Sequence, residues 1–178
     1  ETMRTFKKNL LITGLPGVGK TTLIKNLAET LDPLHPVGFY TAEIREGRTR
    51  KGFEWISLDG RRGVLSHTDI QSRHRVGKYK VDIEGFENLL GSLSFFSPSA
   101  RLIIIDEIGK MECLSDRFKT WLNECLDSEK WVIATIALKG TGFIEAVKKR
   151  HDVRLFEMTQ RNRDSLLNEI LKEVKHIA

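Results

Sequence analysis

Eight consecutive residues near the N-terminus have the glycine, lysine and hydroxyl pattern of a loop that binds the phosphates of a nucleotide. Residues 14–21 read G-L-P-G-V-G-K-T, which matches the spacing G-x-x-x-x-G-K-[ST]. Glycines lack Cβ atoms, so backbone N–H groups can close around a phosphate at the positive end of a helix. Lys20 would then reach the β- and γ-phosphates, and the Thr21 hydroxyl would bind Mg²⁺. We expect the nucleotide contacts to come from Gly14, Leu15, Pro16, Gly17, Val18, Gly19, Lys20, Thr21 and Thr22.

Two carboxylates that follow a second apolar run predict the rest of the chemistry. Residues 102–105 suit a parallel strand buried on both faces, and Asp106 and Glu107 come directly after them. Ligands of open α/β sheets bind at the carboxyl ends of the strands, so Asp106 is expected at the Mg²⁺ ion that Thr21 holds. Glu107 would polarise a water molecule for in-line attack on the γ-phosphate. The alternative for Glu107 is an ordinary solvated acid beyond a strand end.

Strand and helix patterns alternate around these residues. Apolar runs predict strands at residues 9–13, 102–106, 131–136 and 153–158. Amphipathic patterns predict helices at residues 22–31, 83–93, 116–126 and 143–150 and after Thr159. Strands that alternate with helices in this way give a three-layer α/β fold with a mostly parallel sheet.

Residues 37–80 interrupt this alternation with short alternating segments and turn signals. Asp59-Gly60 is a strong hairpin signal. We interpret the stretch as an inserted antiparallel β-meander that extends the sheet or folds over the site, with residues 66–78 irregular. It is also basic, because residues 45–80 hold 10 Lys and Arg against 4 Asp and Glu. That charge suits a nucleic-acid patch, a lid over polyphosphate or a solvated hairpin surface.

Length and composition indicate a single globular domain over residues 1–178. The chain has a formal net charge of +5, with 40% hydrophobic and 30% charged residues, which is usual for a soluble protein. No stretch approaches the roughly 18 apolar residues of a membrane span. Residues 1–8 lead into the first strand without the apolar core of a signal peptide, and the two cysteines have no disulfide or metal-ligand pattern. We therefore expect a cytoplasmic protein without membrane contact.

Motifs along nearly the whole chain resemble a known family, the P-loop nucleoside-triphosphatases first described from thermophiles. An animal member of that family is called cancer-related nucleoside-triphosphatase. The string D-E-I-G-K-M-E at residues 106–112 is distinctive, whereas the phosphate-binding loop alone is not. The other matching segments are residues 38–45, 52–53, 75–82 and 162–163.

The resemblance implies a P-loop NTPase fold with an extra strand in the sheet and a catalytic glutamate, which supports Glu107 as the base. It implies slow, Mg²⁺-dependent hydrolysis of several nucleoside triphosphates (ATP, GTP, CTP and UTP) to diphosphate and phosphate. It also makes Thr135, at the end of the next strand, a candidate sensor of the γ-phosphate. No Asn-Lys-x-Asp element that would read guanine occurs in the chain, which fits broad base tolerance.

Two cations near the strand ends are further catalytic candidates. Arg45 could place its guanidinium on the transferring phosphoryl oxygens, and pairing with Glu43 or Glu54 is the alternative. Lys110 could stabilise the same charge in cis or in trans, and an ion pair with Glu112 that orders the loop is the alternative.

Three more cations could contact parts of the nucleotide other than the transferring phosphoryl group. Arg163, in the first turn of the last helix, is a candidate for the base or ribose, with pairing to Asp164 or Glu157 as the alternative. Arg75 and Lys78, in the basic segment, could close over the nucleotide.

The leading hypothesis is a nucleoside-triphosphate phosphohydrolase. A nucleotide or small-molecule kinase is the alternative, although Glu107 weighs against it because a kinase must exclude water as the acceptor. A second alternative is a nucleic-acid-binding protein that is switched by nucleotide through residues 45–80, and it is not favoured.

Overall fold

One continuous sheet runs through the part of the chain that the computed structural model describes, residues 7–175. Its strands are β1 (Asn9–Thr13), β2 (Val37–Glu46), β3 (Thr49–Ser57), β4 (Arg62–His67), β5 (Arg75–Val76), β6 (Tyr79–Val81), β7 (Leu102–Ile108), β8 (Trp131–Ile136) and β9 (Val153–Glu157). The α-helices are α1 (Lys20–Thr30), α2 (Ile83–Ser92), α3 (Asp116–Asp127), α4 (Gly142–Lys148) and α5 (Arg163–Lys175), and the short 3₁₀ helices are η1 (Asp32–Leu34) and η2 (Glu112–Leu114). Residues 1–6, on which the expectation about a signal peptide partly depends, lie outside the described residues.

The strand order across the sheet is β5-β6-β4-β3-β2-β7-β8-β1-β9. Strands β2, β7, β8, β1 and β9 are parallel to one another. The central pair, β7 and β8, is almost completely buried because layers of helices cover both faces, and its residues are apolar except for Asp106, Glu107 and Thr135. Strand β8 separates β1, which leads into the phosphate-binding loop, from β7, which carries Asp106. It is the extra strand that the resemblance implies, and the expected three-layer α/β fold is confirmed.

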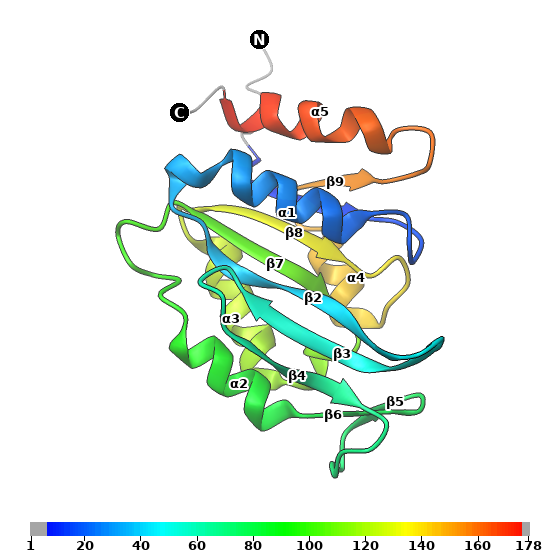
Figure 1. The fold of residues 1–178 in the computed structure, drawn as a ribbon. Coiled ribbons are helices and arrows are strands. Elements are labelled where there is room, and N and C mark those ends of the chain that lie inside the picture. The colour runs from blue at the N-terminus through cyan, green and yellow to red at the C-terminus, as the bar shows by residue number, and fades with distance from the viewer. Residues whose placement is uncertain (1–6, 176–178) are drawn as a thin grey trace.

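Helices α1 and α5 lie on one face of the sheet, and α2, α3 and α4 lie on the other (Figure 1). On the first face Leu27 of α1 packs in a core with Ile133 and Ile104 from the sheet. On the second face α2 packs against α3, and the ring centroids of Phe86 on α2 and Phe118 on α3 lie 5.5 Å apart. These two cores hold the helices against the sheet. Because β1, β8 and β7 are parallel neighbours, their carboxyl ends lie at the same edge of the sheet.

Strands β3, β4, β6 and β5 form an antiparallel extension of the sheet beyond β2, over residues 49–81. The expectation that residues 66–78 are irregular was wrong in part, because β4 continues to His67 and β5 pairs with β6. A strand of two residues is too short to show alternation, and Gly77, at φ 58, makes the tight turn that creates it.

The last helix begins later than its sequence signals suggest. The sequence predicts a helix directly after Thr159, but α5 starts at Arg163. Asn162 explains the delay, because its side-chain oxygen accepts the Thr159 N–H at 2.7 Å and its amide donates to the Glu157 carbonyl at 2.8 Å. This local turn competes with helix formation until residue 163.

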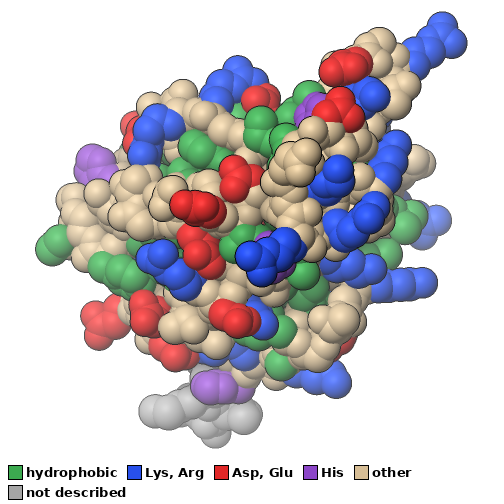
Figure 2. All heavy atoms as spheres, turned by 90° about the horizontal axis from the view of Figure 1, so that it is seen from below, with side chains coloured by type: hydrophobic (Ala, Val, Ile, Leu, Met, Phe, Trp, Pro, Cys, Tyr) green, Lys and Arg blue, Asp and Glu red, His purple; other side chains and the backbone are tan. Residues whose placement is uncertain are grey.

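Basic side chains gather on the side of the molecule where the β2–β3 hairpin and the β5–β6 ribbon lie (Figure 2). Part of this charge is neutralised locally by ion pairs, which join Arg45 and Arg50 to Glu43, Arg61 to Asp59, and Arg62 to Glu54. The surface therefore does not favour a nucleic-acid interface over a solvated hairpin. Between residues 7 and 175 none of the helices combines the length and the apolar character needed to cross a membrane.

Candidate active site

The loop between β1 and α1 has the backbone geometry that its glycines allow. Gly17 and Gly19 adopt φ values of 79° and 112°, where side chains with a Cβ are strained, and Gly19 is the residue directly before α1. Gly14 is required for a different reason, because a Cβ there would lie 2.6 Å from the carbonyl oxygen of Met158. The loop is thus packed against the end of β9 and turns directly into α1, whose N-terminus favours an anion.

Lys20 and Thr21 are the first two residues of α1, so both side chains start from the rim of this loop. Lys20 Nζ donates to the carbonyl oxygens of Gly14 at 2.7 Å and Leu15 at 3.1 Å. The ammonium group therefore spans the loop, where it can exchange these carbonyls for phosphate oxygens. Thr21 Oγ1 donates to Asp106 Oδ2 at 2.7 Å.

The Asp106 carboxylate accepts hydrogen bonds from two hydroxyl groups, one on α1 and one on β8. Its second carboxylate oxygen, Oδ1, accepts a hydrogen bond from Thr135 Oγ1 at 2.6 Å, in addition to the Thr21 bond. Burial raises the pKa of Asp106, and the hydrogen bonds from Thr135 and Thr21 oppose that rise. Thr135 is fully buried, so in this structure its hydroxyl orients Asp106.

Glu107 and Glu112 bring two further carboxylates to the same place. A Cβ at Gly109 would lie 2.6 Å from Glu107 Oε1 and 3.1 Å from Glu112 Oε1, so both carboxylates crowd over this glycine. Burial raises the pKa of Glu107, and the negative charge of Asp106 raises it further. A carboxylate with a raised pKa is a better proton acceptor, which suits a general base.

These groups line one cleft of about 890 Å³, within the range of sites for small ligands and cofactors. Its walls come from the phosphate-binding loop, the end of β7 with the turn after it, and the antiparallel extension. The lining residues are Pro16, Gly17, Gly19, Lys20, Thr21, Thr22, Thr41, Ala42, Glu43, Arg50, Phe53, Leu65, Val76, Gly77, Tyr79, Asp106, Glu107, Lys110, Met111, Glu112 and Ala137.

The sequence candidates divide into those inside and those outside this cleft. Lys110 lines it and is exposed, and the described residues show no ion pair between Lys110 and Glu112. Arg45 is not among the lining residues, and it pairs with Glu43 at 2.7 Å. Arg163 is also outside, exposed and 3.9 Å from Asp164. In the structure Arg45 therefore forms an ion pair with Glu43, and Arg163 forms one with Asp164, as the alternatives to nucleotide contact predicted.

Arg50 lines the cleft, although sequence reasoning did not single it out. Its only sequence signal is its position two residues before the matching pair Gly52-Phe53. Arg75 and Lys78 are not lining residues, whereas Val76 and Gly77 between them are.

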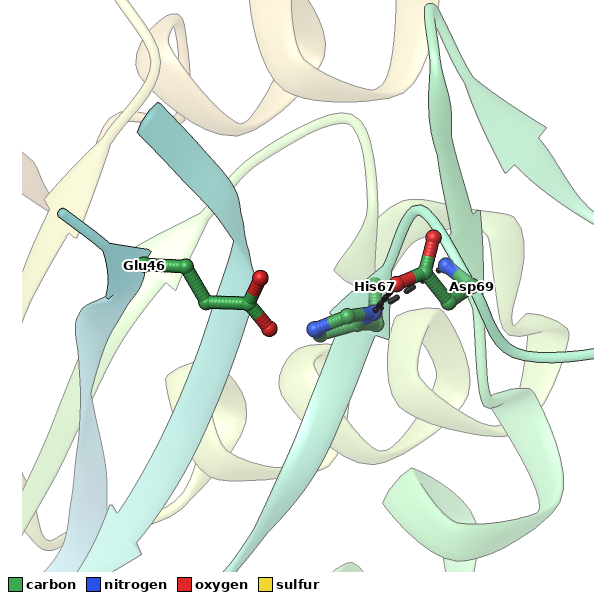
Figure 3. A group of neighbouring side chains, drawn as sticks. All are labelled: Glu46, His67 and Asp69. Atoms are coloured by element: carbon green, nitrogen blue, oxygen red, sulfur yellow. Dashed lines mark hydrogen bonds and ion pairs between the residues drawn. The ribbon is translucent and has the colours of Figure 1, made fainter. Parts of the chain in front are cut away.

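A separate group of potential metal ligands lies at the end of the β2–β3 hairpin (Figure 3). Among the described residues, Glu46, His67 and Asp69 are the one set of three His, Cys, Asp or Glu side chains whose ligand atoms lie within 4.8 Å of one another. The Asp69 N–H donates to His67 Nδ1 at 3.0 Å. This bond occupies the Nδ1 lone pair, so a metal could bind Nδ1 only if the bond were broken. Glu46 and Asp69 are also exposed, and exposed acidic groups are common without a metal, so we assign no metal to this group.

Glu112 gives a prediction for stability. Burial, followed by the charges of Glu107 and Asp106, raises its pKa well above the ordinary 4.5. The folded state then binds more protons than the unfolded state, so this group lowers the free energy of unfolding as pH rises above about 4.5. Glu112→Gln removes the titration. We expect the stability of Glu112→Gln relative to wild type to increase between pH 4.5 and 8, by about 1.4 kcal/mol for each unit of raised pKa.

Chemical denaturation of the metal-free protein at several pH values checks this prediction. The exposed Glu129→Gln is the control, and its stability should run parallel to wild type. Equal pH profiles for Glu112→Gln and wild type would show that Glu112 is charged in the folded protein.

Comparison with known proteins identifies the family of the chain. Residues 9–171 match the family described as NTPase. The chain is 51% identical over 167 residues to the nucleoside-triphosphatase THEP1 of Thermotoga maritima, covering 93% of this chain and 95% of that protein. It is 39% identical over 180 residues to the human cancer-related nucleoside-triphosphatase, covering 92% and 95%. The crystal structure of THEP1 from Aquifex aeolicus has a TM-score of 0.79 at 32% identity, covering 92% of this chain and 97% of that one. The chain therefore belongs to this NTPase family, as its motifs indicated.

Proposed function

We propose that the chain is a nucleoside-triphosphate phosphohydrolase that cleaves ATP, GTP and other nucleoside triphosphates to diphosphate and phosphate. The observation that carries the proposal is the convergence of Lys20, Thr21, Asp106 and Glu107 on one cleft. A phosphate-binding loop alone would serve binding or transfer equally well. The adjacent Glu107 supplies a base for water, which hydrolysis needs. The names of the relatives, all nucleoside-triphosphatases, support the same activity.

The residues present fit a magnesium ion. Thr21 Oγ1 and Asp106 Oδ2 lie 2.7 Å apart, and Mg²⁺ prefers hydroxyl, carboxylate and phosphate oxygens. Thr135 orients the other carboxylate oxygen, which is the support that metal-binding carboxylates usually have. Bound there with the nucleotide, Mg²⁺ would neutralise negative charge on the phosphate oxygens.

Each side chain has a separate task in this proposal. Lys20 binds the β- and γ-phosphates and counters their charge. Glu107 accepts a proton from the water that attacks the γ-phosphorus, while the β-phosphate oxygen leaves with the electron pair of the broken bond. Turnover is expected to be slow, as the resemblance implies. Base tolerance is expected to be broad, because the chain lacks a guanine-reading element.

Release of inorganic phosphate tests the function. The purified protein is incubated with ATP, GTP, CTP or UTP, with Mg²⁺ or with EDTA, and without any acceptor. We expect phosphate release from all four nucleotides with Mg²⁺, and loss of release with EDTA. If turnover instead requires a nucleoside, a monophosphate or another hydroxyl acceptor, the chain is a kinase and the proposal is wrong.

A further inference from the structure

The antiparallel extension forms one wall of the cleft, and Arg50 is the charged residue among the described residues that it contributes to the lining. Arg50 lies on β3, and Tyr79 on β6 and Phe53 on β3 lie beside it. Among the described residues that line the cleft, the cations are Lys20, Arg50 and Lys110. Only Arg50 of these has a planar guanidinium, which can contact two phosphoryl oxygens at once.

The guanidinium is held from several sides. Arg50 Nε donates to the Tyr79 hydroxyl at 2.8 Å, and Nη1 donates to Glu43 Oε1 at 3.2 Å. The same group lies over the rings of Phe53 and Tyr79, 5.1 Å and 5.5 Å from their centroids. The hydrogen bond that Arg50 donates to Tyr79 is the main cause that raises the pKa of Arg50 above its usual value, so the group stays charged. Among the described contacts, Nη2 makes no hydrogen bond, and it remains available to a ligand.

The sheet order decides which end of a nucleotide this wall faces. The proposed metal ligands, Thr21 and Asp106, lie on the side of the loop nearer β7, so the γ-phosphate would point toward β7. The nucleoside end would then extend toward β9, on the opposite side of β1. Arg50 approaches from beyond β2, which is the γ-phosphate side.

We propose that Arg50 is the arginine that contacts the γ-phosphoryl oxygens during hydrolysis, supplied in cis by the antiparallel extension. The proposal rests on the phosphohydrolase function above. As charge spreads over the transferring phosphoryl group, a preorganised guanidinium stabilises it without having to be ordered first. Tyr79 is a positioning residue, because it acts on the reaction through Arg50.

Arg45 is the matched control that the chain offers. It lies near Arg50 across the β2–β3 pair and also bonds to Glu43, at 2.7 Å. However, Arg45 is exposed, donates to the Arg48 carbonyl and does not line the cleft. Removal of either arginine breaks an ion pair with Glu43, but only removal of Arg50 takes a cation from the γ-phosphate side.

The test compares Arg50→Ala, Arg45→Ala and wild type in steady-state ATP hydrolysis, with the Kd for Mg-ADP and the melting temperature measured in parallel. An arginine in this position contributes about 10³-fold or more to kcat, so we expect a loss of that size in Arg50→Ala with the Kd for Mg-ADP nearly unchanged. Arg45→Ala should keep near-normal turnover. Added guanidinium ion at non-denaturing concentration should partly restore Arg50→Ala. Tyr79→Phe, which keeps the ring but removes the hydroxyl acceptor, should lower kcat by a smaller factor.

Two results would overturn the assignment of Arg50. One is near-normal kcat in Arg50→Ala, and the other is a defect confined to KM, which would make Arg50 a ground-state contact only. If Arg50→Ala does not fold, Arg50→Lys decides, because it keeps the charge but not the planar fork. The proposal requires at least a tenfold loss of kcat in folded Arg50→Lys, and near-normal kcat there refutes it. Absence of phosphate release by wild type would instead refute the phosphohydrolase function, so the two failures are distinguishable.

Discussion

Glu107→Gln is expected to bind Mg-ATP with nearly normal affinity and to hydrolyse it about 10²–10⁴-fold more slowly. The amide has the size of the carboxylate and keeps one acceptor oxygen, but it cannot take a proton from water. The loss should therefore fall on the chemical step. Single-turnover hydrolysis and nucleotide affinity, measured side by side, check both parts of the expectation.

A long-lived complex with triphosphate should also be visible in Glu107→Gln. Because the ligand binds only the folded state, the melting temperature should rise with ATP concentration for as long as the nucleotide is not consumed. Asp106→Asn is the informative contrast. Asp106 bonds directly to Thr21, so its substitution should weaken Mg²⁺-dependent binding as well as turnover. Near-normal turnover in Glu107→Gln would mean that water is activated by Glu43, Glu112 or the γ-phosphate itself.

Lys20→Ala is expected to abolish detectable hydrolysis and tight nucleotide binding while the fold remains intact. The lysine would make charge-assisted contacts with two phosphates, each worth about 1.5–3 kcal/mol. Together these contacts correspond to about 10²-fold or more in Kd. Among the described residues, the hydrogen bonds of Lys20 Nζ are to loop carbonyls alone, those of Gly14 and Leu15. Its removal therefore opens no cavity in the core.

Lys25→Ala is the control for this variant. Lys25 belongs to the same helix, is exposed, and lies over the Tyr40 ring at 5.1 Å. It should keep normal binding and turnover, measured by titration with a fluorescent ATP analogue and by phosphate release. Hydrolysis by Lys20→Ala at the wild-type rate would show that the phosphate-binding loop is not part of the active site.

The parts of the site that sequence alone predicted are those built by short stretches of chain. Residues 14–21 and their flanking strand and helix are local, because glycine φ values and helical spacing need no distant partner. Asp106 could be placed for the same reason, since an apolar run followed by a carboxylate identifies a strand end. The alternation of strands and helices likewise predicted the three-layer fold.

Tertiary structure decided which distant side chains complete the site. Arg45 and Arg50 are both basic residues of the meander, and only strand pairing with its bulge beside Ile44 places Arg50 against Tyr79, inside the cleft. No local pattern could show this, because the register of β3 and β6 depends on pairing between segments separated along the chain. The burial of Glu112 has the same origin. Its raised pKa comes from desolvation by packed neighbours and from charges on other residues, and that packing exists only after the chain has folded.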